Sequence, residues 1–256
     1  MVSTWRILSC LALSLWLTAA EGPGGSRMPV QGTTHLQVPA HPLDVILGRP
    51  TANSITLSLL CYNDEEGVIA YGTGPEHLDL ATPTQHFAKG EPVEIVLSGL
   101  KPDSDYVYEF RGRGLTGPRS RFHTARPPGS TFTFTVAADS HLDENTDPKL
   151  YDRTLAGALA DGPDFHIDLG DTFMTEKHAS RDDAATQYLA QRWHFGQLCR
   201  SAPLFFVLGN HDGEYPRGKD GDDQAVWSNR MRKRYYPNPI PDGFYTGNAV
   251  PHPTAG

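Results

Sequence analysis

The sequence predicts a two-domain chain in which an all-β sandwich is followed by an α/β domain. Between residues 35 and 125 the chain consists of short segments that alternate apolar and polar residues and are separated by turns. After a Pro-Pro-Gly linker at 126–130, the order becomes strand, helix, strand, helix, strand. The first pattern is typical of an antiparallel sandwich, and the second predicts parallel, buried strands.

The composition indicates a folded, acidic, turn-rich chain. The 256 residues include 22 Lys and Arg, 30 Asp and Glu, 25 Gly and 21 Pro, giving a formal charge of −8. Hydrophobic residues make up 38%. These values exclude a collagen-like, coiled-coil or wholly disordered chain. The acidic balance argues against nucleic-acid binding and against attachment to anionic lipid.

Residues 1–20 predict a secretory signal peptide. Arg6 is the only charge before the apolar run 7–17, and small residues at 18–20 precede Glu21. The run is about half the ~20 residues that a spanning helix needs. We therefore expect an exported protein, whether secreted, periplasmic or at the cell surface, with no stable membrane anchor after signal removal. A retained N-terminal anchor is the alternative. Residues 21–34 predict a flexible lead-in.

The cysteines give no disulfide framework. Without Cys10, only Cys61 and Cys199 are left, and they fall in different predicted domains. We do not expect a disulfide between them, and so few thiols exclude a thiolate zinc cluster.

The predicted sandwich covers residues 35–125. Its expected strands are 54–62, 67–72, 93–97, 106–111 and 120–124. The segment 97–108, LSGLKPDSDYVY, resembles the corner of a fibronectin type III-like domain. This resemblance implies that the Tyr106 hydroxyl bonds to upstream backbone, and it carries no information about function.

The predicted α/β domain covers residues 131–256. Its expected elements are a strand at 131–138, a helix at 148–159, a strand at 165–169, a helix at 183–199 and a strand at 203–208.

Each of the three strands of this domain ends in a polar cluster. The clusters are Asp139-Ser140-His141, Gly170-Asp171-Thr172 and Gly209-Asn210-His211-Asp212. Ligands bind beyond the carboxyl ends of parallel strands, so we expect the clusters to converge on one site. Carboxylate, imidazole and amide oxygen without thiolate suit Mn, Fe, Co or Zn, and a carboxylate after a central strand can bridge two ions.

The series D-x-H, G-D and G-N-H-D, each piece following an apolar strand, resembles the calcineurin-like metallophosphoesterase family. The resemblance implies an αββα-type domain that hydrolyses small-molecule phosphate esters, either monoesters or diesters. It also implies two divalent or trivalent metal ions and a metal-bound hydroxide as nucleophile. The implied metal ligands are Asp139 and His141 on the first metal, Asp171 as the bridge and Asn210 on the second metal. His211 would stand near the leaving-group oxygen as proton donor or charge stabiliser, and Asp212 would orient His211 and stabilise its charge.

The combination of sandwich and phosphoesterase domain is similar to purple acid phosphatases and to alkaline phosphatase D-like enzymes. Purple acid phosphatases would have a tyrosine where Met174 stands and would lack His141, so we expect no tyrosinate-to-iron colour. The family completes its metal shell with later histidines, including a Gly-His-x-His pair, whereas only His252 follows His211 here. We therefore expect an incomplete phosphoesterase domain, with this chain alone weakly active or inactive.

One functional alternative comes from outside the enzymes: a non-catalytic exported binding module on a degenerate phosphoesterase scaffold. Metal content separates the two, since the enzyme needs two ions per chain and the binding module needs none. The metal identity, the choice between monoesters and diesters, and the oligomeric state stay open.

Several other polar residues receive structural interpretations. We expect Asp168 to form a structural hydrogen bond, His166 to lie in the core, and His178 and His194 to be solvated. Arginines crowd the end of the predicted sandwich, and we interpret them as solvated surface or interdomain salt bridges, with attraction of a phosphorylated substrate as the alternative. They are Arg111, Arg113, Arg119, Arg121 and Arg126.

Overall fold

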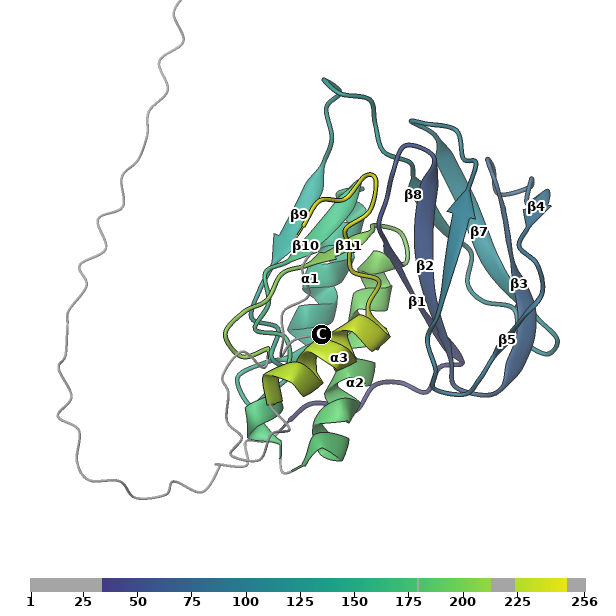
Figure 1. Ribbon diagram of the computed structural model, residues 1–256. Coiled ribbons are helices and arrows are strands. Elements are labelled where there is room, and N and C mark those ends of the chain that lie inside the picture. The colour runs from purple at the N-terminus through teal and green to yellow at the C-terminus, as the bar shows by residue number, and fades with distance from the viewer. Residues whose placement is uncertain (1–33, 179, 213–223, 248–256) are drawn as a thin grey trace, which may run out of the picture.

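The computed structural model describes residues 34–178, 180–212 and 224–247. Two bodies lie side by side, one built from β1 to β8 and the other from β9 to β11 with the helices (Figure 1). The predicted signal peptide, the lead-in up to residue 33, and His252 lie outside the described residues.

The first body is a sandwich of two antiparallel sheets. One sheet has the order β1-β2-β6, formed by Leu43–Gly48, Ser54–Cys61 and Val93–Ser98. The other has the order β4-β3-β7-β8, with β5 also paired to β3. Its strands are β3 Glu65–Gly72, β4 Leu80–Ala81, β5 Gln85–Phe87, β7 Asp105–Gly112 and β8 Ser120–His123. The sequence patterns predict all of these except β1, β4 and β5.

Inward-facing apolar residues of both sheets fill the core of the sandwich. They include Leu57 and Leu59 of β2, Ile69 of β3 and Phe110 of β7. The Tyr106 hydroxyl accepts a hydrogen bond from the Lys101 amide at 2.9 Å. The predicted bond between this tyrosine and upstream backbone is therefore confirmed.

The second body is a three-stranded parallel sheet with helices against one face. Its order is β11-β10-β9, formed by Leu204–Phe206, Phe165–Asp168 and Phe134–Ala137. The helices are α1 Pro148–Ala160, α2 Arg181–Cys199 and α3 Gln224–Tyr235, with a short 3-10 helix η1 at Thr175–Lys177. The predicted alternation of strands and helices is confirmed, whereas α3 and η1 were not predicted. Because β10 is central, Asp171 follows the middle strand.

Capping residues explain where the two longer helices begin. The Asp147 side chain accepts a hydrogen bond from the Lys149 amide at 2.9 Å, and Pro148 occupies the first turn of α1. The Ser180 hydroxyl accepts from the Asp183 amide at 3.1 Å at the start of α2.

The two bodies share a hydrophobic core. Both faces of β1 and β2 are buried, because one face looks into the sandwich and the other contacts the α/β body. Ile46 and Leu60 lie in the same buried cluster as Tyr188 and Phe195 of α2. The sandwich therefore packs directly against α2.

Arg192 is fully buried at this junction. Its guanidinium donates to the Ser58 carbonyl at 3.0 Å and to the Ser58 hydroxyl at 3.1 Å, and also to the Tyr235 carbonyl. A single side chain of α2 thus satisfies polar groups of β2 and of the C-terminal end of α3.

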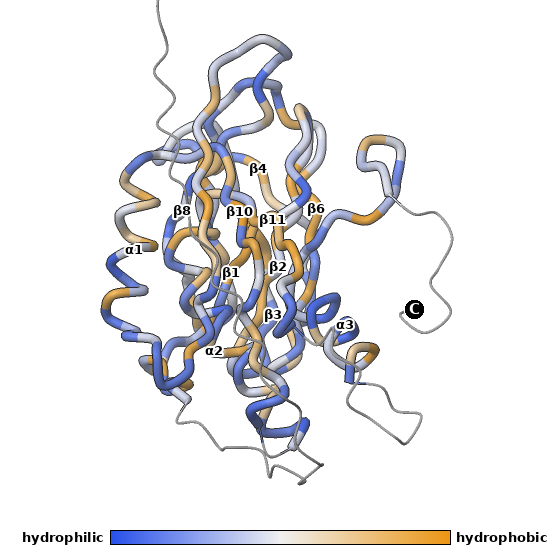
Figure 2. Tube along the Cα trace, turned by 90° about the vertical axis from the view of Figure 1, so that its left-hand side faces the viewer, coloured by the Kyte–Doolittle hydropathy of each residue, from blue (hydrophilic) through white to orange (hydrophobic). Residues whose placement is uncertain are grey.

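The other face of the parallel sheet is apolar and exposed within the described ranges. Phe134 and Val136 of β9 are 47% and 50% exposed, and the Phe134 and Phe165 rings stack with centroids 5.4 Å apart. Hydrophobic colouring runs along β11, whereas α1 alternates between hydrophilic and hydrophobic stretches (Figure 2). The described part of the chain holds one of the two sheets that an αββα domain implies.

No helix among the described residues combines the length and the apolar character needed to cross a membrane. Cys61 and Cys199 are both buried and free, as expected.

Candidate metal centre

Three predicted ligands come together at the carboxyl ends of β9 and β10. Asp139, His141 and Asp171 each offer one ligand atom, and these atoms all lie within 4.8 Å of one another. Asp139 is exposed, and the other two are half-buried. His141 Nε2 lies 3.6 Å from Asp139 Oδ1. Two carboxylates and an imidazole at this spacing fit a borderline or hard metal ion.

The backbone at this centre is strained. Asp139, His141, Leu142 and Asp171 all have positive φ, at 59°, 37°, 55° and 53°. Residues other than glycine rarely adopt this conformation, and such strain concentrates at functional sites because surrounding structure has to hold it.

Two glycines allow the loops after β10 and β11 to touch. A Cβ at Gly170 would lie 2.0 Å from the Gly209 amide nitrogen, and a Cβ at Gly209 would lie 2.2 Å from the Asp171 amide nitrogen. Gly170 also has φ of 90°, which favours glycine. The Gly-Asp and Gly-Asn-His-Asp sequences therefore meet backbone against backbone.

Asp212 joins these loops through hydrogen bonds to their backbone amides. Its buried carboxylate accepts hydrogen bonds from the amides of Gly209, Asp171, Thr172 and Phe173 at 2.7–2.9 Å. Burial outweighs these bonds and raises the pKa of Asp212. Backbone amides contact both oxygens of this carboxylate, and its expected role of orienting His211 stays a prediction.

Glu176 contacts the His211 ring. Its carboxylate contacts His211 Nδ1, while the His211 amide donates to Asp171 Oδ1 at 2.7 Å. The rings of His211 and His141 lie 6.0 Å apart, edge to face. His211 therefore stands beside the ligand cluster. No strand-end motif marks Glu176, since it belongs to the unpredicted η1.

Asn210 lies between Gly209 and His211, so the touching loops place its backbone next to Asp171. Its side chain is exposed.

Two glutamines of α2 form hydrogen bonds to the loops that carry the predicted ligands. Gln187 accepts from the Met174 amide at 3.0 Å and donates to the His141 carbonyl at 2.5 Å. Gln191 donates to the Ser140 hydroxyl at 3.0 Å and to the Thr172 carbonyl at 3.2 Å. Helical spacing suggests the buried face of α2, but it could not show that these amides reach the ligand loops.

An ion pair flanks the cluster. Lys177 Nζ lies 2.5 Å from Asp143 Oδ2, and that carboxylate is 3.6 Å from His141 Nδ1. Burial opposes ionisation of Asp143, but the hydrogen bonds from Lys177 and the Asn145 amide, together with the nearby positive charge of Lys177, outweigh it and lower the pKa of Asp143. Lys177 of η1 is therefore paired with the loop that contains Asp143.

Asp168 and His166 behave as expected. Asp168 Oδ1 accepts from the Gly170 amide at 3.0 Å and from the Thr172 hydroxyl at 2.7 Å, and burial raises the pKa of Asp168 to about 7. His166 is buried with Nδ1 2.8 Å from the Thr135 hydroxyl, and burial lowers its pKa to about 4.

The expectation that His178 and His194 are solvated is wrong. The side chains of both are 2% exposed. His178 contacts Asp183 and Gln187, and His194 Nδ1 lies 2.7 Å from Asp152 of α1. Neighbouring helices cover both rings, which residue type alone did not indicate.

The described chain joins a β-sandwich to a parallel α/β sheet and gathers two aspartates and a histidine at the strand ends. The model of the calcineurin-like phosphoesterase family matches residues 132–250 of this chain.

Two solved structures share the combined fold. The structure of PhoD has 14% identity and a TM-score of 0.52, covering 87% of this chain and 49% of that chain. Purple acid phosphatase PPD1 from yellow lupin (Lupinus luteus) seeds has 15% identity and a TM-score of 0.53, covering 73% of this chain and 39% of that chain. This chain thus spans about half the length of the first structure and about two fifths of the second. A comparison with curated protein sequences gives no significant match.

Proposed function

We propose that this protein hydrolyses small-molecule phosphate esters with two metal ions held at the candidate centre. The observation that carries the proposal is the convergence of Asp139, His141 and Asp171 within 4.8 Å, beside His211. These donors suit Mn, Fe, Zn or Co. The family match and the two similar folds support the same chemistry.

Each residue then has a defined task. Asp139 and His141 would hold the first ion, Asp171 would bridge, and Asn210 would hold the second. When bound, the ions supply an activated water molecule and neutralise charge on the phosphoryl oxygens. His211 presents its ring toward the same space and protonates the leaving-group oxygen, while Glu176 fixes the orientation of that ring.

We also propose that the protein is exported and that its two domains divide at residues 126–130. Export is supported by the charge, apolar run and small residues of the first 20 positions. The division is supported by the change from sandwich to parallel sheet between β8 and β9.

The first experiment measures metal content and hydrolysis together. The protein is loaded separately with Mn²⁺, Zn²⁺, Co²⁺ and Fe²⁺, dialysed, and analysed for metal per chain. Hydrolysis of p-nitrophenyl phosphate and of bis(p-nitrophenyl) phosphate is then followed. Two ions per chain and metal-dependent turnover are expected of a protein that carries the full ligand set, and these 256 residues alone should turn over weakly. Absence of bound metal under all four conditions would support the non-catalytic binding module instead.

Asp171→Asn tests the bridging position. The substitution keeps the size of the side chain but removes the charge that two cations would share, so we expect bound metal to fall and turnover to drop at least 100-fold. Asp242→Asn is the matched control, because Asp242 is an exposed aspartate outside the cluster. Full activity in Asp171→Asn would remove this residue from the site.

A further inference from the structure

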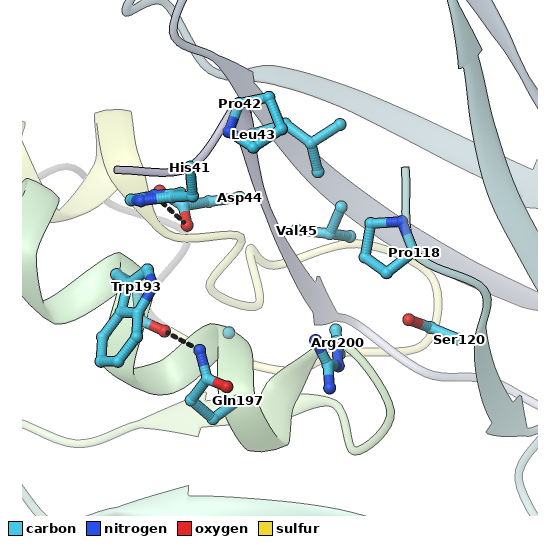
Figure 3. Close-up of a pocket in the computed structure, with 11 residues that line it drawn as sticks. His41, Pro42, Leu43, Asp44, Val45, Pro118, Ser120, Trp193, Gln197 and Arg200 are labelled. Carbon is cyan, nitrogen blue, oxygen red and sulfur yellow. Dashed lines mark hydrogen bonds and ion pairs between the residues drawn. The ribbon is translucent and has the colours of Figure 1, made fainter. Parts of the chain in front are cut away.

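A pocket lies away from the metal centre, where α2 meets the sandwich (Figure 3). It has a volume of about 170 Å³. Its walls come from β1 and the residues just before it, from the segment before β8, and from the last turns of α2. It shares no residue with the cluster of Asp139, His141 and Asp171.

Much of the pocket wall is apolar. Leu43, Val45 and Pro118 lie on the sandwich side, opposite the Trp193 indole on α2 (Figure 3). Gly196 leaves room between them, since a Cβ there would meet only the Val45 carbonyl oxygen, at 3.8 Å, and Asp44 Oδ1, at 4.0 Å. The shape accommodates a small apolar body.

The one acidic side chain that lines the pocket is already paired. Asp44 Oδ1 lies 3.0 Å from His41 Nε2, and Asp44 Oδ2 accepts a hydrogen bond from the Tyr62 hydroxyl at 2.7 Å. The Asp44 carboxylate therefore has an ion-pair neighbour on one oxygen and a hydrogen-bond donor on the other.

Arg200 carries a positive charge that has no ion-pair partner among the described residues. Its backbone carbonyl accepts from the Tyr108 hydroxyl at 2.7 Å, but its guanidinium has no hydrogen bond or ion pair to any described residue. A shallower depression of about 340 Å³ shares Arg200 and Ser120 with the pocket and contains Arg119 and Arg121. Arg119 is paired with Glu109, whereas Arg121, like Arg200, has no such partner among the described residues.

We propose that this pocket binds an organic anion, with its apolar body between Trp193 and Pro118 and its anionic group on the Arg200 guanidinium. A planar guanidinium with free donors suits the oxygens of a carboxylate, sulfonate or phosphate. The proposal does not depend on the proposed hydrolysis, because it uses none of the residues at the metal centre.

The test uses benzenesulfonate, which has an aromatic body and an anionic group but no phosphoester to hydrolyse. Benzyl alcohol is the neutral probe of similar size. The full chain is titrated with each probe while the indole ¹⁵N–¹H signals of Trp193 and Trp227 are followed. We expect benzenesulfonate to shift the Trp193 signal saturably, with benzyl alcohol at least tenfold weaker, since a hydrogen bond to a charged group contributes that much.

Variants assign the effect to the pocket. Arg200→Met keeps the aliphatic stem and removes the charge, so we expect at least tenfold weaker binding, and Arg200→Lys should restore part of it. Gly196→Leu should fill the pocket and abolish binding. Gly196→Ala is the milder variant, because its Cβ makes only ordinary contacts, and it should weaken binding with no loss of folding. Arg121→Met is the control and should bind within twofold of the unmodified chain.

Three outcomes would overturn the proposal. The first is no saturable shift of Trp193, and the second is equal affinity for benzenesulfonate and benzyl alcohol. The third is unchanged benzenesulfonate affinity in Arg200→Met with a thermal unfolding midpoint like that of the unmodified chain. Because Asp171→Asn should bind benzenesulfonate normally, failure of the hydrolysis proposal and failure of this one are distinguishable.

Discussion

At the scale of single residues, the main feature of the metal centre is the pairing of His211 with a carboxylate that lies outside the strand-end motifs. Glu176 contacts His211 Nδ1, whereas the Asp212 carboxylate accepts hydrogen bonds from four backbone amides. The ring can therefore be held in one orientation by a residue that lies 35 positions earlier in the chain. A sequence motif lists neighbouring residues, but it does not show which of their side chains contact each other.

We expect Glu176→Gln to slow hydrolysis through its effect on His211. Turnover of an alkyl phosphate, whose leaving group needs protonation, should fall about tenfold, and that of p-nitrophenyl phosphate should change little. His211→Ala should show the same leaving-group dependence more strongly. The double variant should match His211→Ala alone, since the two residues act as a unit. Multiplicative losses in the double variant would show that Glu176 does not work through His211.

His166 predicts a pH dependence of stability. Burial lowers its pKa from 6.5 to about 4, so the folded protein keeps the ring neutral while the unfolded chain takes up a proton below pH 6.5. The contribution of His166 to the free energy of unfolding is complete above pH 6.5. It decreases by about 3 kcal/mol as the pH falls toward 4.

His166→Gln removes the titrating ring and keeps a polar side chain near Thr135. Urea unfolding at pH 7 and at pH 4 should show about 3 kcal/mol less acid destabilisation in the variant than in the unmodified protein. Identical acid destabilisation in the two proteins would mean that His166 is not held neutral in the fold.

At the scale of elements, the metal centre depends on the contacts and hydrogen bonds that hold the loops after β10 and β11 together. The two glycines permit contact between the loops, and the Asp212 carboxylate bonds to both. From the helix side, Gln187 and Gln191 fasten the loops after β9 and β10 to α2. The strained φ values of Asp139, His141 and Asp171 are maintained by this fastening.

Asp212→Asn should therefore destabilise the fold rather than simply change the pH profile. An amide offers a single acceptor oxygen, and its NH₂ group would face backbone N–H donors, leaving buried amides unpaired. We expect a loss of about 3 kcal/mol in urea unfolding. Asp242→Asn is the control, because Asp242 accepts from the Phe244 and Tyr245 amides in an exposed turn, and its loss should be much smaller. Equal losses would contradict the fastening role.

At the scale of the whole molecule, the sandwich and the α/β body are one folding unit in this structure. Ile46 and Leu60 of the sandwich lie in the core that contains α2, and Arg192 joins β2 to the end of α3. Separating the bodies would expose apolar surface and leave the buried partners of Arg192 unpaired, so we expect a single unfolding transition.

The two free cysteines can report on the two bodies separately. Cys61 lies in β2 and Cys199 at the end of α2, and burial raises the pKa of both thiols, that of Cys61 to about 11. In a Cys10→Ser background, the variants Cys61→Ala and Cys199→Ala each keep one thiol. Both thiols should become reactive toward a disulfide reagent at the same urea concentration. Exposure of one thiol at clearly lower urea would show that the bodies unfold independently.

The sequence by itself determined the sandwich, the parallel sheet and the convergence of Asp139, His141 and Asp171. Such features follow from local patterns: alternation predicts strands, and parallel strands direct their carboxyl ends to one edge. Only the tertiary structure decided which polar groups meet across that edge. These contacts join elements that are distant in sequence. They are Glu176 with His211, Gln187 with the ligand loops, and Arg192 with the sandwich. Their partners depend on how helices and sheets pack, and no local period in a single sequence records that packing.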